Sequence, residues 1–209
     1  QGYSSAASDV YKRQGHMYSF RFKLYATLLV TGGAIILFLT KGSALISLYL
    51  TDTVGNGATD LALQYGLEYL AIMMVGLIPF AVNQSYATNI KETGQTLIPM
   101  LASFVAVGTN AILDYLMIFG IGPFPELGVQ GAALATVIAR YIEALIVVIW
   151  AHIHRGKNRY LEGAYTGFGI PLAELKAILI KGFPLMMNEV MWAAVSYTHL
   201  RAHETAANL

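Results

Sequence analysis

The sequence contains no cysteine, and only 12% of its 209 residues are charged. Without cysteine, disulfides, thiolate metal sites and a cysteine nucleophile are excluded. A soluble domain carries about 25% charged residues, because its surface must face water. This chain, with 56% hydrophobic residues, has too few charges to coat such a surface. It therefore needs a second, apolar solvent, and a lipid bilayer supplies one.

Two other classes of protein find little support. The net charge is only +1, whereas nucleic-acid binding needs a concentrated basic face. The sequence contains no HExxH, no Walker A loop, no GxSxG and no GxGxxG in a βαβ context, so no pattern indicates an enzyme. We therefore expect neither nucleic acid nor a cofactor among its partners.

Four long apolar runs and a fifth, weaker one predict helices that cross the membrane. At 1.5 Å per residue, runs of about 20–27 residues extend about 30–40 Å, enough to cross a hydrocarbon core. The runs lack the alternation of a strand, and open sheet edges cannot face lipid. The predicted fold is an all-α, polytopic transmembrane helical bundle. Its transmembrane region covers 15–152, with helices at 24–50, 69–89, 96–119 and 128–152, and a further transmembrane helix starts after the loop, at 175–195.

The charges of the loops predict the orientation of these helices. The loops at 51–68 and 120–127 contain acidic residues but no Lys or Arg. Under strict alternation every basic loop falls on the other side, including the long loop 153–174. The positive-inside rule makes that side cytoplasmic. We therefore expect a multi-pass protein of the cell membrane, with the lipid bilayer as a partner.

The two ends of the sequence differ from the runs between them. Residues 1–14 (QGYSSAASDVYKRQ) and 196–209 (SYTHLRAHETAANL) are polar and resemble translated adapter sequence. We expect both tails to be non-native and the natural protein to extend beyond both. Such segments stay outside the reasoning about the fold.

Asn110 and Asp114 stand four residues apart in the sequence TNAILDYLMIFG. The spacing places both on one helical face, about one turn apart. A carboxylate inside a span is costly and usually faces a protein interior or a water cavity. Burial would favour its protonation, and with the Asn oxygen the pair could instead coordinate a hard cation such as Na⁺. The pair could equally form a polar clasp between helices, or Asp114 could lie near the outer interface.

The next helix offers further polar residues. Thr136, in GAALATVIAR, could add a hydroxyl to the same site if the two helices pack together. The small residues from Gly131 to Ala135 would permit a close approach, although packing is the usual purpose of such a face. Arg140 and Glu143 stand three residues apart and are predicted to pair with each other.

Two prolines lie inside predicted spans and are candidate hinges, because proline removes a backbone hydrogen bond. Polar residues follow each of them, and these could line a substrate cavity or form hydrogen bonds between helices. The prolines are Pro79 and Pro184, followed by Asn83 and Gln84 and by Asn188 and Glu189.

Several linked segments resemble the multidrug and toxic compound extrusion (MATE) family of the MOP exporter superfamily, over about residues 61–192. KETGQTLIPM follows a proline-containing helix, NAILDYLMIFGIGPFPELGVQGAALATVIARYIE forms the next helical pair, and GFPLMMNEVMW opens a further helix. The sharpest pieces are GxTxxP at 94–99 and LGVxGAA at 127–133. The order and spacing of the segments carry the resemblance, more than any one of them.

The resemblance implies a partial N-terminal lobe: the third to sixth helices and the start of the seventh, out of twelve in two lobes. Such proteins exchange Na⁺ or H⁺ for organic cations and other amphipathic compounds. Asn110 and Asp114 match the family's N-lobe cation site by their NxxxDY context, and Thr136 matches a sixth-helix hydroxyl. Glu189 lies near an acidic position of the seventh helix. The missing partners would be the first two helices and the C-terminal lobe, so this chain alone should not transport.

The predicted function is therefore part of a cation-coupled exporter of drugs or other small amphipathic or cationic compounds, and two alternatives stay open. One is a flippase of lipid-linked sugars from the same superfamily. Such flippases usually line the cavity with several Arg or Lys, whereas these spans contain little besides Lys41 and Arg140. The other is a non-transporting membrane scaffold, in which Asp114 would be dispensable. The residues decide neither the cargo nor the choice between Na⁺ and H⁺.

Overall fold

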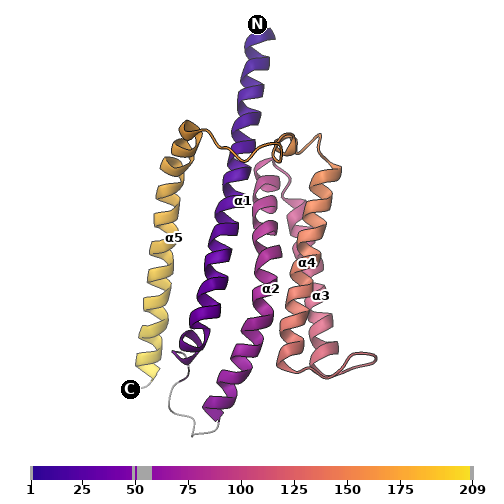
Figure 1. The fold of residues 1–209 in the computed structure, drawn as a ribbon, viewed down its shortest axis with the longest axis vertical. Helices are drawn as coiled ribbons and strands as arrows, with labels where there is room; N and C mark the ends of the chain where they lie inside the picture. Colours follow the sequence, from indigo (N-terminus) through magenta and orange to yellow (C-terminus); the bar gives the residue numbers. More distant parts are fainter. Residues whose placement is uncertain (1, 49, 51–57, 208–209) are drawn as a thin grey trace. The chain divides into compact units, whose positions relative to one another are not determined.

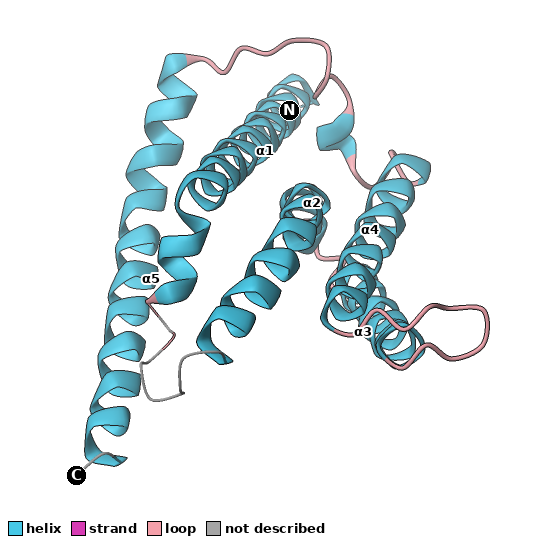
Figure 2. Ribbon diagram, turned by 60° about the horizontal axis from the view of Figure 1, so that its bottom comes forward, coloured by secondary structure: helices cyan, strands magenta, loops and turns pink. Residues whose placement is uncertain are grey.

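The computed structural model describes residues 2–48, 50 and 58–207, and this part of the chain consists of helices and their connections, without a strand (Figures 1 and 2). The all-α fold class predicted from the sequence is confirmed. The chain divides into two units, Gln1–Thr166 and Gly167–Leu209, which we describe separately. The helices are α1 (Gly2–Ser47), α2 (Ala58–Glu92), α3 (Leu97–Ile118), α4 (Val129–Ile153), the short 3-10 helix η1 (Arg159–Leu161) and α5 (Leu172–Ala207).

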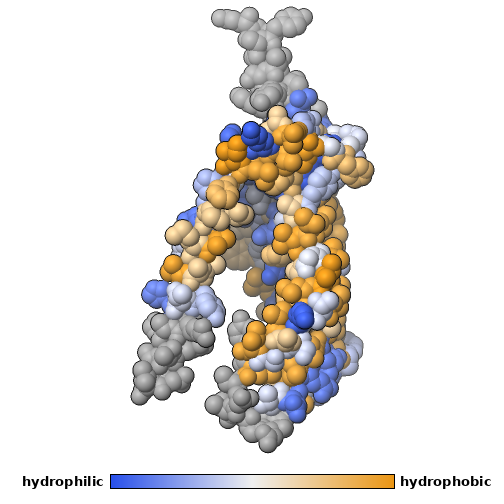
Figure 3. All heavy atoms as spheres, turned by 60° about the vertical axis from the view of Figure 1, so that its left-hand side comes forward, coloured by the Kyte–Doolittle hydropathy of each residue, from blue (hydrophilic) through white to orange (hydrophobic). Residues whose placement is uncertain are grey.

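By length and composition, five of the described helices can cross a membrane. The candidate spans are Gln14–Ser47, Thr59–Glu92, Leu97–Ile118, Val129–Ile153 and Leu172–His199. Large apolar side chains remain on the outside of the first unit, where Leu29 is 78% exposed and Phe104 is 68% exposed. Apolar residues cover much of the visible helix surfaces (Figure 3). A bilayer accommodates these side chains, whereas water would not. The protein is a multi-pass membrane protein.

The helices extend further than the apolar runs in the sequence. α1 begins at Gly2 rather than at 24, α2 begins at Ala58 rather than at 69, and α5 covers Leu172–Ala207 rather than 175–195. The prediction followed apolar residues, whereas backbone hydrogen bonds continue through polar turns that water can solvate. Most of both predicted tails is therefore helical here. Residues 1, 208 and 209 of those tails, and 49 and 51–57 around the first predicted loop, lie outside the described residues.

In the first unit α4 is the central helix. It packs against α2 and against α3, while α1 packs against α2 (Figure 1). The residues of α4 that make these contacts are mostly small: Gly131, Ala133, Ala135, Ala139, Ala144 and Ala151 are all buried. Small side chains let helix backbones approach closely, which is how helices associate where lipid provides no hydrophobic driving force.

The closest approach lies at the start of α4. A Cβ atom on Gly131 would stand only 2.7 Å from the Met117 carbonyl oxygen of α3. In the connection between the two helices, the Leu127 backbone N–H donates to the same oxygen at 2.9 Å, and Gly128 adopts a positive φ of 53°. Both glycines of the LGVxGAA motif are thus required by the backbone: Gly128 permits the turn, and Gly131 permits the close contact between α3 and α4.

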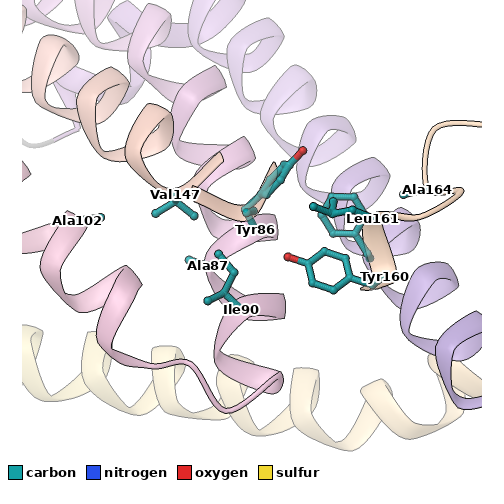
Figure 4. Packing of buried hydrophobic residues seen from close by; sticks show 10 residues of the cluster. Tyr86, Ala87, Ile90, Ala102, Val147, Tyr160, Leu161 and Ala164 are labelled. Carbon is teal, nitrogen blue, oxygen red and sulfur yellow. The ribbon is translucent and has the colours of Figure 1, made fainter. Parts of the chain in front are cut away.

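A buried hydrophobic cluster lies at the opposite end of α4, where α2 also ends. Figure 4 shows Tyr86 and Ile90 of α2, Val147 of α4 and Tyr160 of η1 in this cluster. The Phe20 ring of α1 packs between two of them, with ring centroids 5.1 Å from Tyr86 and 5.2 Å from Tyr160. The cluster therefore ties α1, α2, α4 and the loop after α4 together.

Polar contacts reinforce this end of the unit. Arg21 of α1 is buried and donates from Nε to the Ala164 carbonyl oxygen at 2.8 Å and from Nη2 to that of Gly163 at 2.6 Å. Lys23 of α1 forms an ion pair of 2.5 Å with Glu92 at the end of α2. In the same region burial raises the pKa of the Tyr160 phenol.

The contact of α3 with α4 predicts a difference between two glycines. Gly131→Ala should lower the free energy of unfolding by about 1–3 kcal/mol, because its methyl group would overlap the Met117 carbonyl and force the helices apart. Gly108→Ala, on an open face of α3 where an added Cβ meets nothing within 4 Å, is the matched control. Thermal unfolding of the purified protein in detergent measures both. Equal midpoints for the two variants would contradict the close packing.

Candidate functional site

The polar residues predicted on neighbouring helices lie on the faces of α3 and α4 that meet. The Asn110 side-chain nitrogen donates to the Thr136 hydroxyl oxygen at 3.3 Å, and that hydroxyl donates to the Ala132 carbonyl oxygen at 3.0 Å. The structure therefore places Asn110 and Thr136 in contact across the helix pair. Both side chains are half-buried.

Asp114 lies one turn further along α3 than Asn110. Its side chain is half-buried, and its Oδ1 atom is fully buried without a hydrogen-bond partner among the described residues. Buried polar atoms are almost always hydrogen-bonded, so each exception needs an explanation. A bound proton or a metal cation is the simplest partner for a carboxylate oxygen in such a place.

A cavity of about 170 Å³ opens between the two helices beside Asn110 and Thr136, and we call it the α3–α4 cavity; Asp114 does not line it. It is lined by Ser103, Ala106, Val107 and Asn110 of α3 and by Thr136, Ala139, Arg140 and Glu143 of α4. A second cavity of about 160 Å³, the α2–α4 cavity, is lined by Met73, Gly76, Leu77 and Phe80 of α2 and by Thr136, Val137 and Arg140 of α4. Thr136 and Arg140 therefore border both cavities.

A second polar group adjoins the first. The Ser103 hydroxyl donates to Glu143 Oε1 at 2.7 Å, and Arg140 Nη1 donates to Glu143 Oε2 at 3.5 Å. The predicted pairing of Arg140 with Glu143 is confirmed. The contact from Ser103 was not predicted, although Ser103, Asn110 and Asp114 share a helical face by their spacings of seven and four. This shared face is the feature of the sequence from which a contact between Ser103 and α4 could have been predicted.

The polar residues after Pro79 do not join this site. Asn83 is buried on α2 with its Oδ1 atom unpartnered among the described residues, and Gln84 is exposed. Neither lines the α3–α4 cavity or the α2–α4 cavity. Pro79 lies inside α2, which continues through it to Glu92.

The corresponding residues of the second unit all lie on α5. Pro184 lies inside this helix, which continues through it, and Asn188 and Glu189 are exposed within the unit. These residues belong to the second unit, so their predicted role in lining a substrate cavity stays a prediction.

The chemistry of the site is that of hard oxygen ligands. One carboxylate, one side-chain amide and one hydroxyl stand along the facing surfaces of two membrane-length helices. Within the described residues, no group of three His, Cys, Asp or Glu side chains gathers to hold a metal. Oxygen ligands of this kind suit Na⁺, while the carboxylate alone suits H⁺. Polar residues of this kind inside membrane spans are frequent in the ion and substrate pathways of transporters.

Comparison with known sequences gives the family. The profile of the MatE family matches residues 12–116, half of the chain. The chain belongs to the MatE family, the multidrug and toxic compound extrusion transporters, as its sequence motifs had indicated.

Individual relatives agree with this assignment. A probable multidrug resistance protein NorM of Thermotoga maritima is 38% identical over 80 residues, which cover 38% of this chain and 17% of the relative. A NorM protein of Bacillus cereus is 28% identical over 160 residues, covering 68% of this chain and 33% of the relative. An FAD transporter of Shewanella oneidensis is 34% identical over 112 residues, covering 52% and 23%. The matches thus span a third or less of these relatives, and no solved structure matches the chain.

The bond between Ser103 and Glu143 predicts a measurable coupling. Ser103→Ala should lower the free energy of unfolding by about 1–3 kcal/mol, because it leaves a buried carboxylate oxygen without its donor. In the Glu143→Gln background the same change should cost less, because no charge is then left unpaired. A double-mutant cycle from thermal unfolding in detergent measures the difference.

The control for this cycle is Thr88→Ala. Among the residues that the structure describes, this exposed hydroxyl of α2 bonds only the Gln84 carbonyl of its own helix, so its removal should have little effect in either background. Additive effects of Ser103→Ala and Glu143→Gln would contradict the coupling.

Proposed function

We propose that the protein carrying this chain is a cation-coupled exporter, in which Asp114, Asn110 and Thr136 hold the coupling ion. The observation that carries the proposal is the buried Asp114 Oδ1 atom, which has no hydrogen-bond partner among the described residues. A carboxylate in a span of low dielectric constant is stable only when a positive charge accompanies it. The Asn110 amide nitrogen is engaged with Thr136, so its oxygen is the atom available to a cation.

The coupling ion is Na⁺ or H⁺, because either one neutralises the same buried charge. Export follows if the ion and the exported compound favour different conformations of the helices around the site. A ligand shifts such an equilibrium only by its difference in affinity for the two conformations. A buried carboxylate meets this condition, because its free energy changes by several kcal/mol between the charged and neutralised forms.

The names of the relatives support the class of cargo. Two of those described above are named as multidrug resistance proteins, which supports drugs and other amphipathic compounds as cargo. The FAD transporter supports a flavin nucleotide as a second candidate. A flippase is supported less, because Arg140 is the one basic residue among the described residues that line the α3–α4 and α2–α4 cavities. A non-transporting scaffold would leave the unpartnered Asp114 oxygen unexplained.

The orientation proposed from the sequence gains support from the first unit. Lys23 pairs with Glu92, and Arg21 binds carbonyls of the loop that contains Arg155 and Arg159, so basic residues gather at one end. At the other end of α2 and α4, Gln130 donates to Glu68 at 3.1 Å. We propose that the basic end is cytoplasmic, as the positive-inside rule requires.

The test is Asp114→Asn in the full-length protein recovered with its gene. Removing the only charge of the site should reduce export of a cationic dye such as ethidium by at least about tenfold, because about 1.4 kcal/mol of coupling energy corresponds to that factor. Dye efflux from cells expressing the protein measures the change. Repeating the assay at fixed pH with varied Na⁺, and at fixed Na⁺ with varied pH, identifies the ion.

Asp60→Asn is the matched control. Asp60 is exposed in the first turn of α2, so its loss should leave efflux as it is in the unaltered protein. Full efflux by Asp114→Asn, at an equal amount of protein in the membrane, would remove Asp114 from the mechanism, whereas an unaltered protein that exports no dye would favour the scaffold.

A further inference from the structure

Arg140 stands near the middle of α4 (Val129–Ile153), where a permanent positive charge is costly unless it serves a purpose. Its one hydrogen bond within the described residues goes from Nη1 to Glu143 and is long, at 3.5 Å. A guanidinium presents several N–H donors in a rigid fork. Most of these donors therefore have no protein acceptor in the described part of the chain.

The two members of the Arg140–Glu143 pair are held very differently. The Glu143 side chain is only 9% exposed, and Ser103 of α3 fixes its Oε1 atom, whereas the Arg140 side chain is 44% exposed. A pair that served only to neutralise two charges would be short and closed on both sides. This pair balances the net charge yet leaves the guanidinium fork open.

An aromatic ring supports the guanidinium from the neighbouring helix. The Arg140 Cζ atom lies 5.1 Å from the centroid of the Phe80 ring, directly after Pro79 in α2. A cation above an aromatic face is attracted by the ring, and the contact orients the plane of the guanidinium. Arg140 is thus positioned from three helices: by Phe80 of α2, by Ser103 of α3 acting through Glu143, and by α4 itself.

Arg140 lines both cavities. The α2–α4 cavity of about 160 Å³ is otherwise lined by Thr136 and by apolar residues such as Met73 and Leu77, whereas the α3–α4 cavity of about 170 Å³ combines Ala106, Val107 and Ala139 with the polar side chains of Ser103, Asn110, Thr136 and Glu143. Each is smaller than the roughly 300–1,000 Å³ of a pocket for a whole ligand. Each therefore has room for a charged group and the adjoining part of a compound, but not for all of it.

We propose that Arg140 is an anion-binding residue of the transport pathway, which takes the carboxylate or phosphate group of an exported amphipathic compound. Both groups are planar or tetrahedral oxyanions that the guanidinium fork binds through two parallel hydrogen bonds. The inference rests on the proposed export function, to which it adds a class of cargo: anionic or zwitterionic compounds with an apolar body. Asp114 binds the coupling cation, and Arg140 binds the cargo.

The test uses the full-length protein in proteoliposomes with three probes: 7-hydroxycoumarin-3-carboxylate, 4-methylumbelliferyl phosphate and the cation ethidium. The unaltered protein should export at least one anionic probe, and which one tells carboxylate from phosphate. Arg140→Gln should lower the ratio of anionic-probe export to ethidium export by at least about tenfold, as expected for the loss of a paired, charge-assisted hydrogen bond. Arg140→Lys keeps the charge but loses the fork, so its ratio should be intermediate.

Two further variants separate binding from a structural role. Arg155→Gln removes a basic residue from the exposed loop after α4 and should not change the ratio. Glu143→Gln frees Arg140 from its partner, so binding of the anionic probe to the purified protein should become tighter. In a purely structural pair, Glu143→Gln and Arg140→Gln would both weaken the protein and the binding alike.

Direct binding distinguishes the failure of this inference from the failure of the proposed function. If the protein exports none of the probes, fluorescence anisotropy of the coumarin carboxylate still measures its affinity, and Arg140→Gln should weaken that affinity at least about tenfold. Export of ethidium without export or binding of either anionic probe would overturn the role of Arg140. An equal loss of all three probes in Arg140→Gln would overturn it as well.

Discussion

The close contact between α3 and α4 is the constraint on which the site depends. Because Gly131 has no side chain, its backbone lies against the Met117 carbonyl, and the small residues that follow on α4 keep the two helices close along their length. At this separation short side chains can bridge the helices directly: Asn110 reaches Thr136, and Ser103 reaches Glu143. A wider separation would leave the same polar groups facing lipid, where each would cost several kcal/mol.

The charged groups inside the spans divide into two kinds. Glu143 is neutralised by Arg140 and held by Ser103, so its cost is offset within the protein. Asp114 has a buried oxygen with no such partner in the described part of the chain. Carboxylates inside membrane spans are costly and often mark the path of an ion or a proton. The two groups lie along one pair of helices, so the proposed cation-binding residue Asp114 and the proposed oxyanion-binding residue Arg140 share one polar seam between α3 and α4.

The basic end of the first unit is built on different principles. Phe20, Tyr86 and Tyr160 form a packed aromatic cluster, and Arg21 donates to backbone carbonyls of the loop after α4. The loop is thereby fixed to α1, across more than a hundred residues of sequence. The polar seam between α3 and α4, by contrast, adjoins cavities. The basic end is tightly packed, whereas the middle of the bundle contains cavities. This arrangement suits a bundle that holds small molecules near its centre while its basic end stays ordered.

Much of the architecture followed from the sequence alone, because the bilayer imposes rules that single residues reveal. Scarce charge and long apolar runs determined the helices and the membrane, the glycine motifs indicated the family, and helical periodicity placed Asn110 beside Asp114 and Arg140 beside Glu143. These are local properties. The helices extend beyond the predicted spans, because polar turns remain helical where water solvates them.

Only the tertiary structure decided which faces meet. It joined Ser103 to Glu143 and set Phe80 under Arg140, and it kept Asn83 away from the α3–α4 cavity. Such contacts depend on the register of one helix against another, which many small packing contacts determine together and which no spacing within a single helix encodes. The sequence identified the polar residues, but it did not identify their partners, because each contact depends on how two helices pack against each other.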